Sequence, residues 1–392
     1  MTLQPSGERF IGLARLARMA FAGEDLGPLK SGLLDRLSRN ENDANALMDL
    51  SIILQLMGQR QVGLAMQTMA LDLQQLYRLP CPADSAGVRL LALLGPGDLA
   101  QNNALELLTG ESDISLDLLY VAPDLPFPAA LPDHDLAMVA VCETDRNRPL
   151  LKHLETLVKS WPRPVLCVPD RIARLSRDAA CRLLQPVPGV AVPVTTRIDR
   201  QTLESADGFE FPMIVRPVDS QKGKGLIKLD HADAIAGYLQ TRPENAFYIS
   251  RYVDYRGPDG QFRKYRIVLI DGQPYACHMA ISDHWMVHYI SAGMLESAAK
   301  RAEEQRFFEE FDAGFGRRHR DALLSIATRL ELEYVGIDCG ETSDGELLIF
   351  EVDSGMTVHA MDPVDIFPYK QPQMRKVFRA FRQMLLGASA AR

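Results

Sequence analysis

The sequence predicts a chain of mixed α/β and α+β class, because its pattern changes twice along its length. Residues 1–80 carry apolar stripes at helical spacing. Over 87–200, short apolar runs such as "VRLLALLG" and "LAMVAVCE" alternate with helical stretches. This alternation is typical of a parallel sheet with crossover helices. Residues 201–385 hold strand-like runs joined by turn signals, which predict antiparallel hairpins.

Length and composition limit the classes of protein. At 392 residues the chain is too long for one ordinary core, so we expect a helical region at 1–80 and domains at 87–200 and 201–385. A net charge of -8 argues against a general binder of nucleic acid or anionic membranes. We expect no signal peptide and no membrane span. Six cysteines without a CxxC pair indicate reduced thiols in a cytoplasm.

The helical region consists of two predicted helices separated at Gly58-Gln59. Their spacing of Leu, Gly and Ala resembles a single tetratricopeptide helix pair. One such unit does not make a repeat array, since these units need neighbours to bury their faces. A small helical bundle, a packing arm and a peptide-binding arm all remain open.

The stretch "RPVDSQKGKGLIK" combines glycines, lysines and a serine between two predicted strands. Glycine lets a backbone approach phosphates closely, and lysine supplies countercharge. The stretch does not match the Walker pattern GxxxxGK[ST], so it is not an ordinary P-loop. An exposed turn is the alternative interpretation.

Three carboxylates end two neighbouring predicted strands. Asp338 ends "EYVGID", and Glu351 and Asp353 end "LLIFEVD". Side chains alternate along a strand, so Glu351 and Asp353 share a face. The connection "CGETSDGE" has hairpin length, which places Asp338 beside Glu351. Hard oxygen ligands suit magnesium, which usually completes its shell with water and phosphates. The lysine-bearing loop and the acids then form two sides of one nucleoside triphosphate site.

The C-terminal half resembles the ATP-grasp family, nearest to its glutathione-synthetase and glutamate-ligase branch. The matching pieces occur in the family's order: "FPMIVRPVDSQKGKG", "YISRYVDY", "KYRIVLIDG" and "GIDCGETSDGELLIFEVDS". The resemblance implies an ATP-grasp fold over 201–385, preceded by a parallel α/β pre-ATP-grasp domain over 87–200. The helical region lies outside it.

By position, the resemblance assigns roles to individual residues. Asp338, Glu351 and Asp353 would hold one or two Mg2+ ions, with Mn2+ as a substitute. Arg266 matches the arginine that stabilises the transferred phosphoryl group, and with Arg216 it forms the implied catalytic set. The implied ATP-binding residues are Arg216, Ser220, Lys222, Gly223, Lys224, Gly225, Arg251, Tyr252 and Val253. The segment Ser220–Gly225 would close over the phosphates, and the backbone after Ser250 would contact the adenine edge.

Four positions depart from the family pattern. Arg216 replaces a lysine, which keeps the charge but presents a planar fork. Asp353 stands where asparagine is common, and Arg251 where an acidic residue is common. Ala179 falls where a second phosphate-contacting lysine is often found. These departures leave room for an altered nucleotide geometry or weakened catalysis.

A histidine-rich stretch is not generic to the family. "CHMAISDHWMVHY" carries the predicted pocket residues His278, Asp283, His284, Trp285 and His288, which we expect to contact an amino or peptidyl substrate. A structural polar network is one alternative. A zinc site is another, because His284 and His288 are four apart and would suit a metal on a helix. His359 is assigned to the same pocket, with a hydrogen-bonded turn histidine as its alternative.

The expected function is an ATP- and Mg2+-dependent carboxylate–amine ligase that forms an amide through an acylphosphate. Its substrates would be ATP, a carboxylate and an amine, on an amino acid, a peptide or a protein. A homodimer is usual for the family. A catalytically weakened nucleotide-binding scaffold or sensor, with the helical region as its interaction arm, remains open. So does phosphoryl transfer to a non-carboxylate acceptor.

Overall fold

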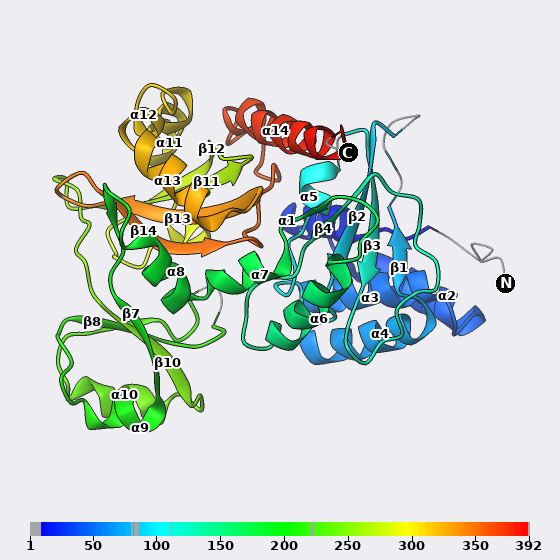
Figure 1. Ribbon diagram of the computed structural model, residues 1–392, viewed down its shortest axis with the longest axis horizontal. Coiled ribbons are helices and arrows are strands. Elements are labelled where there is room, and N and C mark those ends of the chain that lie inside the picture. The colour runs from blue at the N-terminus through cyan, green and yellow to red at the C-terminus, as the bar shows by residue number, and fades with distance from the viewer. Residues whose placement is uncertain (1–8, 80, 82–85, 111, 221–222, 391–392) are drawn as a thin grey trace. The chain divides into compact units, whose positions relative to one another are not determined.

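The computed structural model describes residues 9–79, 81, 86–110, 112–220 and 223–390, which fold into two compact units (Figure 1). Unit 1 comprises the chain up to Cys142, Pro149–Asp170, and the chain from Ser354 onward. Unit 2 comprises Glu143–Arg148 and Arg171–Asp353. The units do not coincide with the three predicted segments, because the helical region and the parallel sheet lie together in unit 1.

Unit 1 begins with the helices α1 (Leu13–Phe21), α2 (Gly27–Arg39), α3 (Ala44–Leu56) and α4 (Arg60–Leu73), of which the two apolar stripes predicted only the pair that flanks Gly58-Gln59. Helix α3 is buried on nearly every side, in keeping with its almost continuous apolar sequence. It starts at Asp43, whose side chain accepts a hydrogen bond from the Ala46 amide at 2.9 Å. The break before α4 occurs at Gly58, whose φ of 80° suits glycine.

The sheet of unit 1 has the strand order β1-β3-β2-β4-β5. Its strands are β1 (Leu76–Arg78), β2 (Val88–Leu94), β3 (Ile114–Tyr120), β4 (Leu136–Val139) and β5 (Val165–Leu166). Strands β2 to β5 pair in parallel, which confirms the predicted parallel sheet, and β1 is an antiparallel edge. The other helices of this part of the chain are α5 (Glu106–Thr109), α6 (Arg148–Val158), α7 (Pro169–Ile172) and the C-terminal α14 (Lys370–Ala390).

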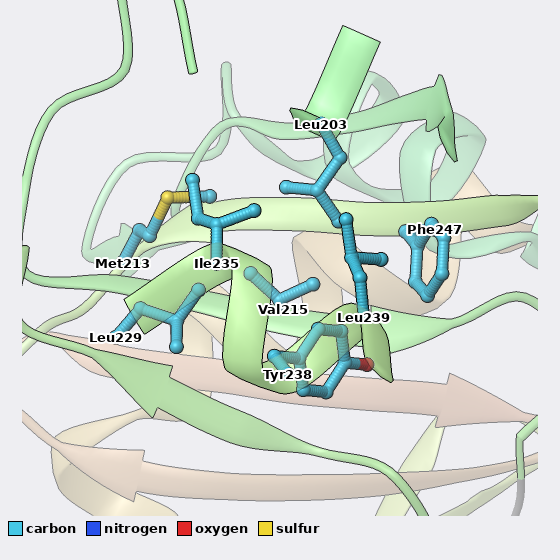
Figure 2. Close-up of a cluster of buried hydrophobic side chains, with 8 residues drawn as sticks. All are labelled: Leu203, Met213, Val215, Leu229, Ile235, Tyr238, Leu239 and Phe247. Atoms are coloured by element: carbon cyan, nitrogen blue, oxygen red, sulfur yellow. The ribbon is translucent and has the colours of Figure 1, made fainter. Parts of the chain in front are cut away.

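Unit 2 contains two sheets. The first is antiparallel, in the order β7-β10-β8-β9. Its strands are β7 (Thr195–Asp199), β8 (Met213–Pro217), β9 (Ile227–Leu229) and β10 (Ala246–Arg251). The pairing of β8 with β9 confirms the hairpin predicted around the glycine- and lysine-bearing loop. Helices α9 (Arg200–Ser205) and α10 (Ala234–Gln240) pack on this sheet. Figure 2 shows the resulting core of Leu203, Met213, Val215, Leu229, Ile235, Tyr238, Leu239 and Phe247.

The second sheet of unit 2 has the order β12-β11-β13-β14-β6. Its strands are β6 (Val190–Ala191), β11 (Phe262–Ile270), β12 (Gln273–Ser282), β13 (Tyr334–Glu341) and β14 (Leu347–Asp353). Asp271 and Gly272 have φ of 49° and 76° and form the predicted turn between β11 and β12. The helices are α8 (Arg177–Leu184), α11 (Ala298–Glu309), α12 (Phe315–Arg318) and α13 (Arg320–Leu330), with short 3₁₀ turns at Ala173–Leu175 and Tyr289–Ser291.

Among the described residues, no helix is both long enough and apolar enough to cross a membrane.

Candidate functional site

Four residues on four neighbouring strands form one row across the second sheet of unit 2. His278 on β12 pairs with Arg266 on β11, Arg266 pairs with Asp338 on β13, and Asp338 pairs with Glu351 on β14. Side chains directly opposite each other in antiparallel strands have Cβ atoms about 5 Å apart. The register therefore confirms that the hairpin places Asp338 beside Glu351.

The row coincides with two irregularities in strand pairing. The register between β11 and β12 shifts after Arg266, and the register between β13 and β14 shifts after Asp338. Each shift leaves one extra residue, Cys277 on β12 and Phe350 on β14. Such bulges bend a strand and change the direction of its side chains, and they are frequent next to active sites.

Asp338 is neutralised by two cations of β11. Lys264 Nζ donates to its carboxylate at 2.9 Å, and Arg266 donates through Nε at 2.8 Å and through Nη2 at 3.0 Å. Asp338 is only 4% exposed. Burial alone would raise the pKa of its carboxyl, but Arg266 and Lys264 outweigh burial and hold this pKa far below its usual range. The aspartate is therefore ionised and fixes the orientation of Arg266.

Glu351 is held by a cation from another part of unit 2. Arg177, the first residue of α8, donates through Nη2 to Glu351 Oε1. Its Nη1 donates to the Phe350 carbonyl at 3.1 Å. The bulge at Phe350 thus provides a second acceptor for the same guanidinium. Arg177 is 20% exposed and Glu351 35% exposed, so water screens this pair only in part.

The predicted metal ligands are Asp338, Glu351 and Asp353. Their carboxylate oxygens are chemically suited to magnesium. Yet the residues that the structure describes include no group of three or more His, Cys, Asp or Glu side chains placed to hold a metal ion. The charges of Asp338 and Glu351 are instead balanced by the chain's own cations. Metal binding by Asp338, Glu351 and Asp353 stays a prediction.

Arg216 lies on β8 and is 9% exposed. It donates to the Ser220 hydroxyl at 3.1 Å and to the Ser220 carbonyl. Burial and repulsion by Arg177 lower the pKa of Arg216 to about 9, against the attraction of Glu351. Across the described parts of the chain, no carboxylate forms an ion pair with Arg216. A buried guanidinium without an ion-pair partner is costly, and an incoming anion would lower this cost.

The loop that follows Ser220 has two residues in the left-handed region. Gly223 and Gly225 both have φ of 72°. The Gly225 carbonyl accepts a hydrogen bond from the Tyr238 hydroxyl at 2.8 Å, which ties the end of the loop to α10. Lys224 is exposed. The predicted phosphate-binding Lys222 lies outside the described residues.

The segment predicted to contact adenine begins where β10 ends. Arg251 is exposed, whereas Tyr252 and Val253 are partly buried. The Tyr252 ring meets the Trp285 ring at 84° and 5.8 Å between centroids, and Lys228 Nζ lies 4.6 Å from the Tyr252 centroid. Part of the predicted adenine segment therefore contacts a residue of the predicted substrate pocket. The structure does not test either role.

The segment Asp283–His288 is not helical. Asp283 and His284 are exposed, while Trp285 and His288 are partly buried. His284 Nδ1 accepts from the Met286 amide at 3.2 Å. The zinc alternative required a helix to bring His284 and His288 together, and that premise is wrong, because the chain leaves β12 through a bend.

His278 lies apart from that segment, within β12. Its ring is 4.7 Å from the Tyr289 ring, and the Tyr289 hydroxyl donates to Glu304 at 3.2 Å. Glu304 is fully buried and also accepts from the Met279 amide at 3.1 Å. This arrangement matches the structural polar network that the sequence left open.

His359 belongs to unit 1, unlike the other predicted pocket residues. Its Nδ1 accepts from the Met361 amide at 3.2 Å, and its ring lies 5.5 Å from the Phe21 ring. The hydrogen bond two residues along the chain is that of a turn histidine, the alternative named above.

Sequence reasoning missed two cations of this site. Lys264 stands two residues before Arg266 and so shares its face of β11, a signal that strand alternation supplies. Arg177 stands two residues before Ala179, the position of the missing lysine. No local pattern pairs it with Glu351, which is 174 residues away along the chain.

Glu143 is a third missed residue. Its side chain is 12% exposed, and Arg148 Nη2 approaches its Oε1 at 3.6 Å. Burial raises the pKa of Glu143 to about 7, and the carboxylates of Asp219, Asp145 and Asp353 reinforce this against Arg148. Carboxylic acids with such a pKa exchange protons near neutral pH and occur at functional sites. Nothing in the sequence around Glu143 indicates this.

Comparison with known proteins gives similar structures at low identity. No family model matches the sequence, and no curated protein matches it. Structure comparison finds an ATP-grasp RimK domain protein of Sphaerobacter thermophilus, at 17% identity and a TM-score of 0.44, covering 76% of this chain and 100% of that one. D-alanyl-alanine synthetase A of Vibrio cholerae follows at 12% identity and 0.48, covering 78% and 99%.

A third similar structure is the D-alanine–D-alanine ligase of Bacillus anthracis complexed with ATP, at 14% identity and a TM-score of 0.46, covering 78% of this chain and 97% of that one. With every one of these TM-scores below 0.5, the resemblance of this chain to the ATP-grasp family stays a prediction that rests on its sequence motifs.

Proposed function

We propose that this chain is an ATP-dependent carboxylate–amine ligase of the ATP-grasp kind. The observation that carries the proposal is the buried guanidinium of Arg216, which has no carboxylate ion-pair partner among the described residues and is repelled by a second guanidinium, that of Arg177. Two adjacent cations repel each other unless an anion comes between them. Arginine forks match phosphate oxygens bidentately, and Arg216 precedes the glycine-containing loop.

The reaction fits these groups without an enzyme nucleophile. A substrate carboxylate oxygen attacks the γ-phosphorus of ATP, the bond to the β-phosphate oxygen breaks, and ADP and an acylphosphate form. A neutral amine then attacks the acyl carbon, phosphate leaves, and the nitrogen loses a proton. Charge spreads over the phosphoryl oxygens during the first step. Arg266, held by Asp338, supplies a preorganised positive charge for it.

The substrate classes follow from the sequence motifs. The carboxylate and the amine belong to amino acids or peptides, and the strands and loop around Trp285 form the acceptor pocket. The helices α1 to α4 are the part of the chain proposed to contact a peptide or protein substrate. One or two magnesium ions and a homodimeric assembly belong to the same proposal.

One observation favours the scaffold or sensor as a second candidate. Buried carboxylates without a metal or a cationic partner are costly, which by itself argues against a scaffold that retains these acids. In the structure, however, Lys264 and Arg266 neutralise Asp338, and Arg177 pairs with Glu351. The chain's own cations therefore balance the charges of Asp338 and Glu351, and the presence of these two acids does not by itself require turnover.

Isothermal titration calorimetry tests whether the protein binds ATP. ATP is titrated into wild type, Arg216→Gln and Glu351→Gln, with and without Mg2+. Arg256→Gln is the control, because the Arg256 side chain is 53% exposed and forms its ion pair with Asp254, which is also 53% exposed. We expect Arg216→Gln to bind ATP at least about tenfold more weakly, a loss of about 1.4 kcal/mol. Wild type that binds no ATP in either condition contradicts the proposal.

Product analysis then separates the candidate functions. A mixture of amino acids and short peptides is incubated with Mg2+ and ATP, and the products are resolved by mass spectrometry. ADP with a new amide supports the ligase. ADP with a stable phosphorylated product supports phosphoryl transfer to another acceptor. Bound ATP that stays intact supports the scaffold.

A further inference from the structure

The position of Arg177 links two groups with different predicted partners. Its Nη2 contacts Glu351, a predicted metal ligand, and its charge acts on Arg216, a predicted phosphate ligand. One carboxylate, that of Glu351, therefore attracts two guanidiniums.

The same guanidinium stands where a metal ion would have to bind. Carboxylate Oε1 of Glu351 accepts from Arg177, and the Phe350 carbonyl accepts from it at 3.1 Å. A cation already at this oxygen opposes a divalent ion by repulsion and by occupying the ligand.

We propose that Arg177 binds two anions in turn: the Glu351 carboxylate when the site holds no nucleotide, and a nucleotide phosphate when it does. The proposal rests on the proposed function for its second half. A divalent ion gains access to Glu351 only when phosphate has drawn Arg177 away. Metal and nucleotide therefore bind with positive coupling, and coupling of this kind is reciprocal. Arg177 also supplies the charge that Ala179 lacks.

The anchoring of α8 allows such a movement of the side chain alone. Arg177 is the first residue of the helix, where Ser176 and Asp178 hold the turn through a 3.1 Å hydrogen bond. Within the described parts of the chain, the guanidinium donates its hydrogen bonds to β14, at Phe350 and Glu351. Rotation of a long side chain that is 20% exposed breaks these contacts without unfolding the helix.

The test measures Mn2+ binding in the absence of nucleotide, by the loss of the free-ion signal in electron paramagnetic resonance. Arg177→Gln removes the competing cation, so Mn2+ should bind at least about tenfold more tightly than to wild type. Arg182→Gln, on the same helix with a side chain 68% exposed, should match wild type. The gain should disappear in the double variant Arg177→Gln with Glu351→Gln, because the released ligand is then gone.

A second measurement tests the phosphate half. A non-hydrolysable ATP analogue is titrated with EDTA present, and Arg177→Gln should bind it at least about tenfold more weakly, with Arg177→Lys in between. If Arg177→Gln does not fold, Arg177→Lys replaces it in both the Mn2+ and the analogue measurements. Unchanged Mn2+ affinity in Arg177→Gln overturns the competition at Glu351. If wild type does not bind the ATP analogue, the proposed function is contradicted. The Mn2+ measurement still decides whether Arg177 competes with a metal ion for Glu351.

Discussion

Replacing Asp49 by asparagine should change how the stability of unit 1 depends on pH. Asp49 lies on α3 and is fully buried. Its carboxylate accepts from the Ile11 amide at 3.0 Å and the Gly12 amide at 3.0 Å, just before α1. Glu106 accepts from the Ala14 amide at 3.0 Å. Two buried carboxyl groups thus cap the N-terminal turn of α1.

The magnitude follows from the pKa of the group. Burial raises the pKa of Asp49 from 3.8 to about 7, against the two backbone amides and Arg36. Between these values the folded state binds more protons than the unfolded state, so the free energy of unfolding falls as pH rises from about 4 to about 7. At about 1.4 kcal/mol per pKa unit, Asp49 lowers stability by about 2–3 kcal/mol between pH 5 and pH 8.

Asparagine retains an oxygen for the amides of Ile11 and Gly12 but does not ionise. The stability of Asp49→Asn relative to wild type should therefore rise by about 2–3 kcal/mol from pH 5 to pH 8. The charge of Asp49 also helps to raise the pKa of Glu106 to about 7, after burial as the main cause. Removing this charge lowers the pKa of Glu106, which also raises the relative stability of Asp49→Asn as pH rises.

The assay is urea unfolding at both pH values, followed by fluorescence. The chain has two tryptophans, Trp161 in unit 1 and Trp285 in unit 2. A Trp285→Phe background leaves Trp161 to report on unit 1. Asp72→Asn, at an exposed position of α4, is the matched control. A relative stability of Asp49→Asn that is the same at pH 5 and pH 8 would refute the reasoning, since no carboxyl group at residue 49 would then titrate in that window.

Two further predictions concern unit 2. Asp338→Asn removes the carboxylate that Lys264 and Arg266 share, and it should cost about 3–5 kcal/mol in urea unfolding followed through Trp285. A cost below about 1 kcal/mol would contradict the buried network. Gly225→Ala should destabilise by more than about 1 kcal/mol and weaken ATP binding, because φ is 72° and its Cβ would lie 2.8 Å from Pro217 Cδ. Gly237→Ala is the matched control on α10, where an added Cβ would meet open space, and it should raise the free energy of unfolding by about 0.5–1 kcal/mol. Equal changes in stability for Gly225→Ala and Gly237→Ala would contradict this reasoning.

Local patterns predicted the elements that surround the site. The turn at Asp271 and Gly272 was predictable because two residues with positive φ suit a tight hairpin. The pairing of Asp338 with Glu351 was predictable because strand alternation and a short connection determine register. The glycine-containing loop between β8 and β9 was predictable for the same reason.

Other features depend on contacts between distant residues. Strand β6 is only Val190–Ala191, too short for any periodicity, and it exists because β14 pairs with it. The assignment of α14 to unit 1 likewise depends on packing. The pKa of Glu143 rises through burial and through the nearness of other carboxylates, neither of which the flanking residues indicate.

The sequence by itself determined the strands that surround the site and the face that Glu351 and Asp353 share, since these follow from local periodicity. Only the tertiary structure decided which cation meets which carboxylate. Arg177 reaches Glu351, and Lys264 and Arg266 share Asp338, because ion-pair energies depend on distance and burial in three dimensions. Two of the three predicted metal ligands, Asp338 and Glu351, are consequently paired with the chain's own arginines and lysine.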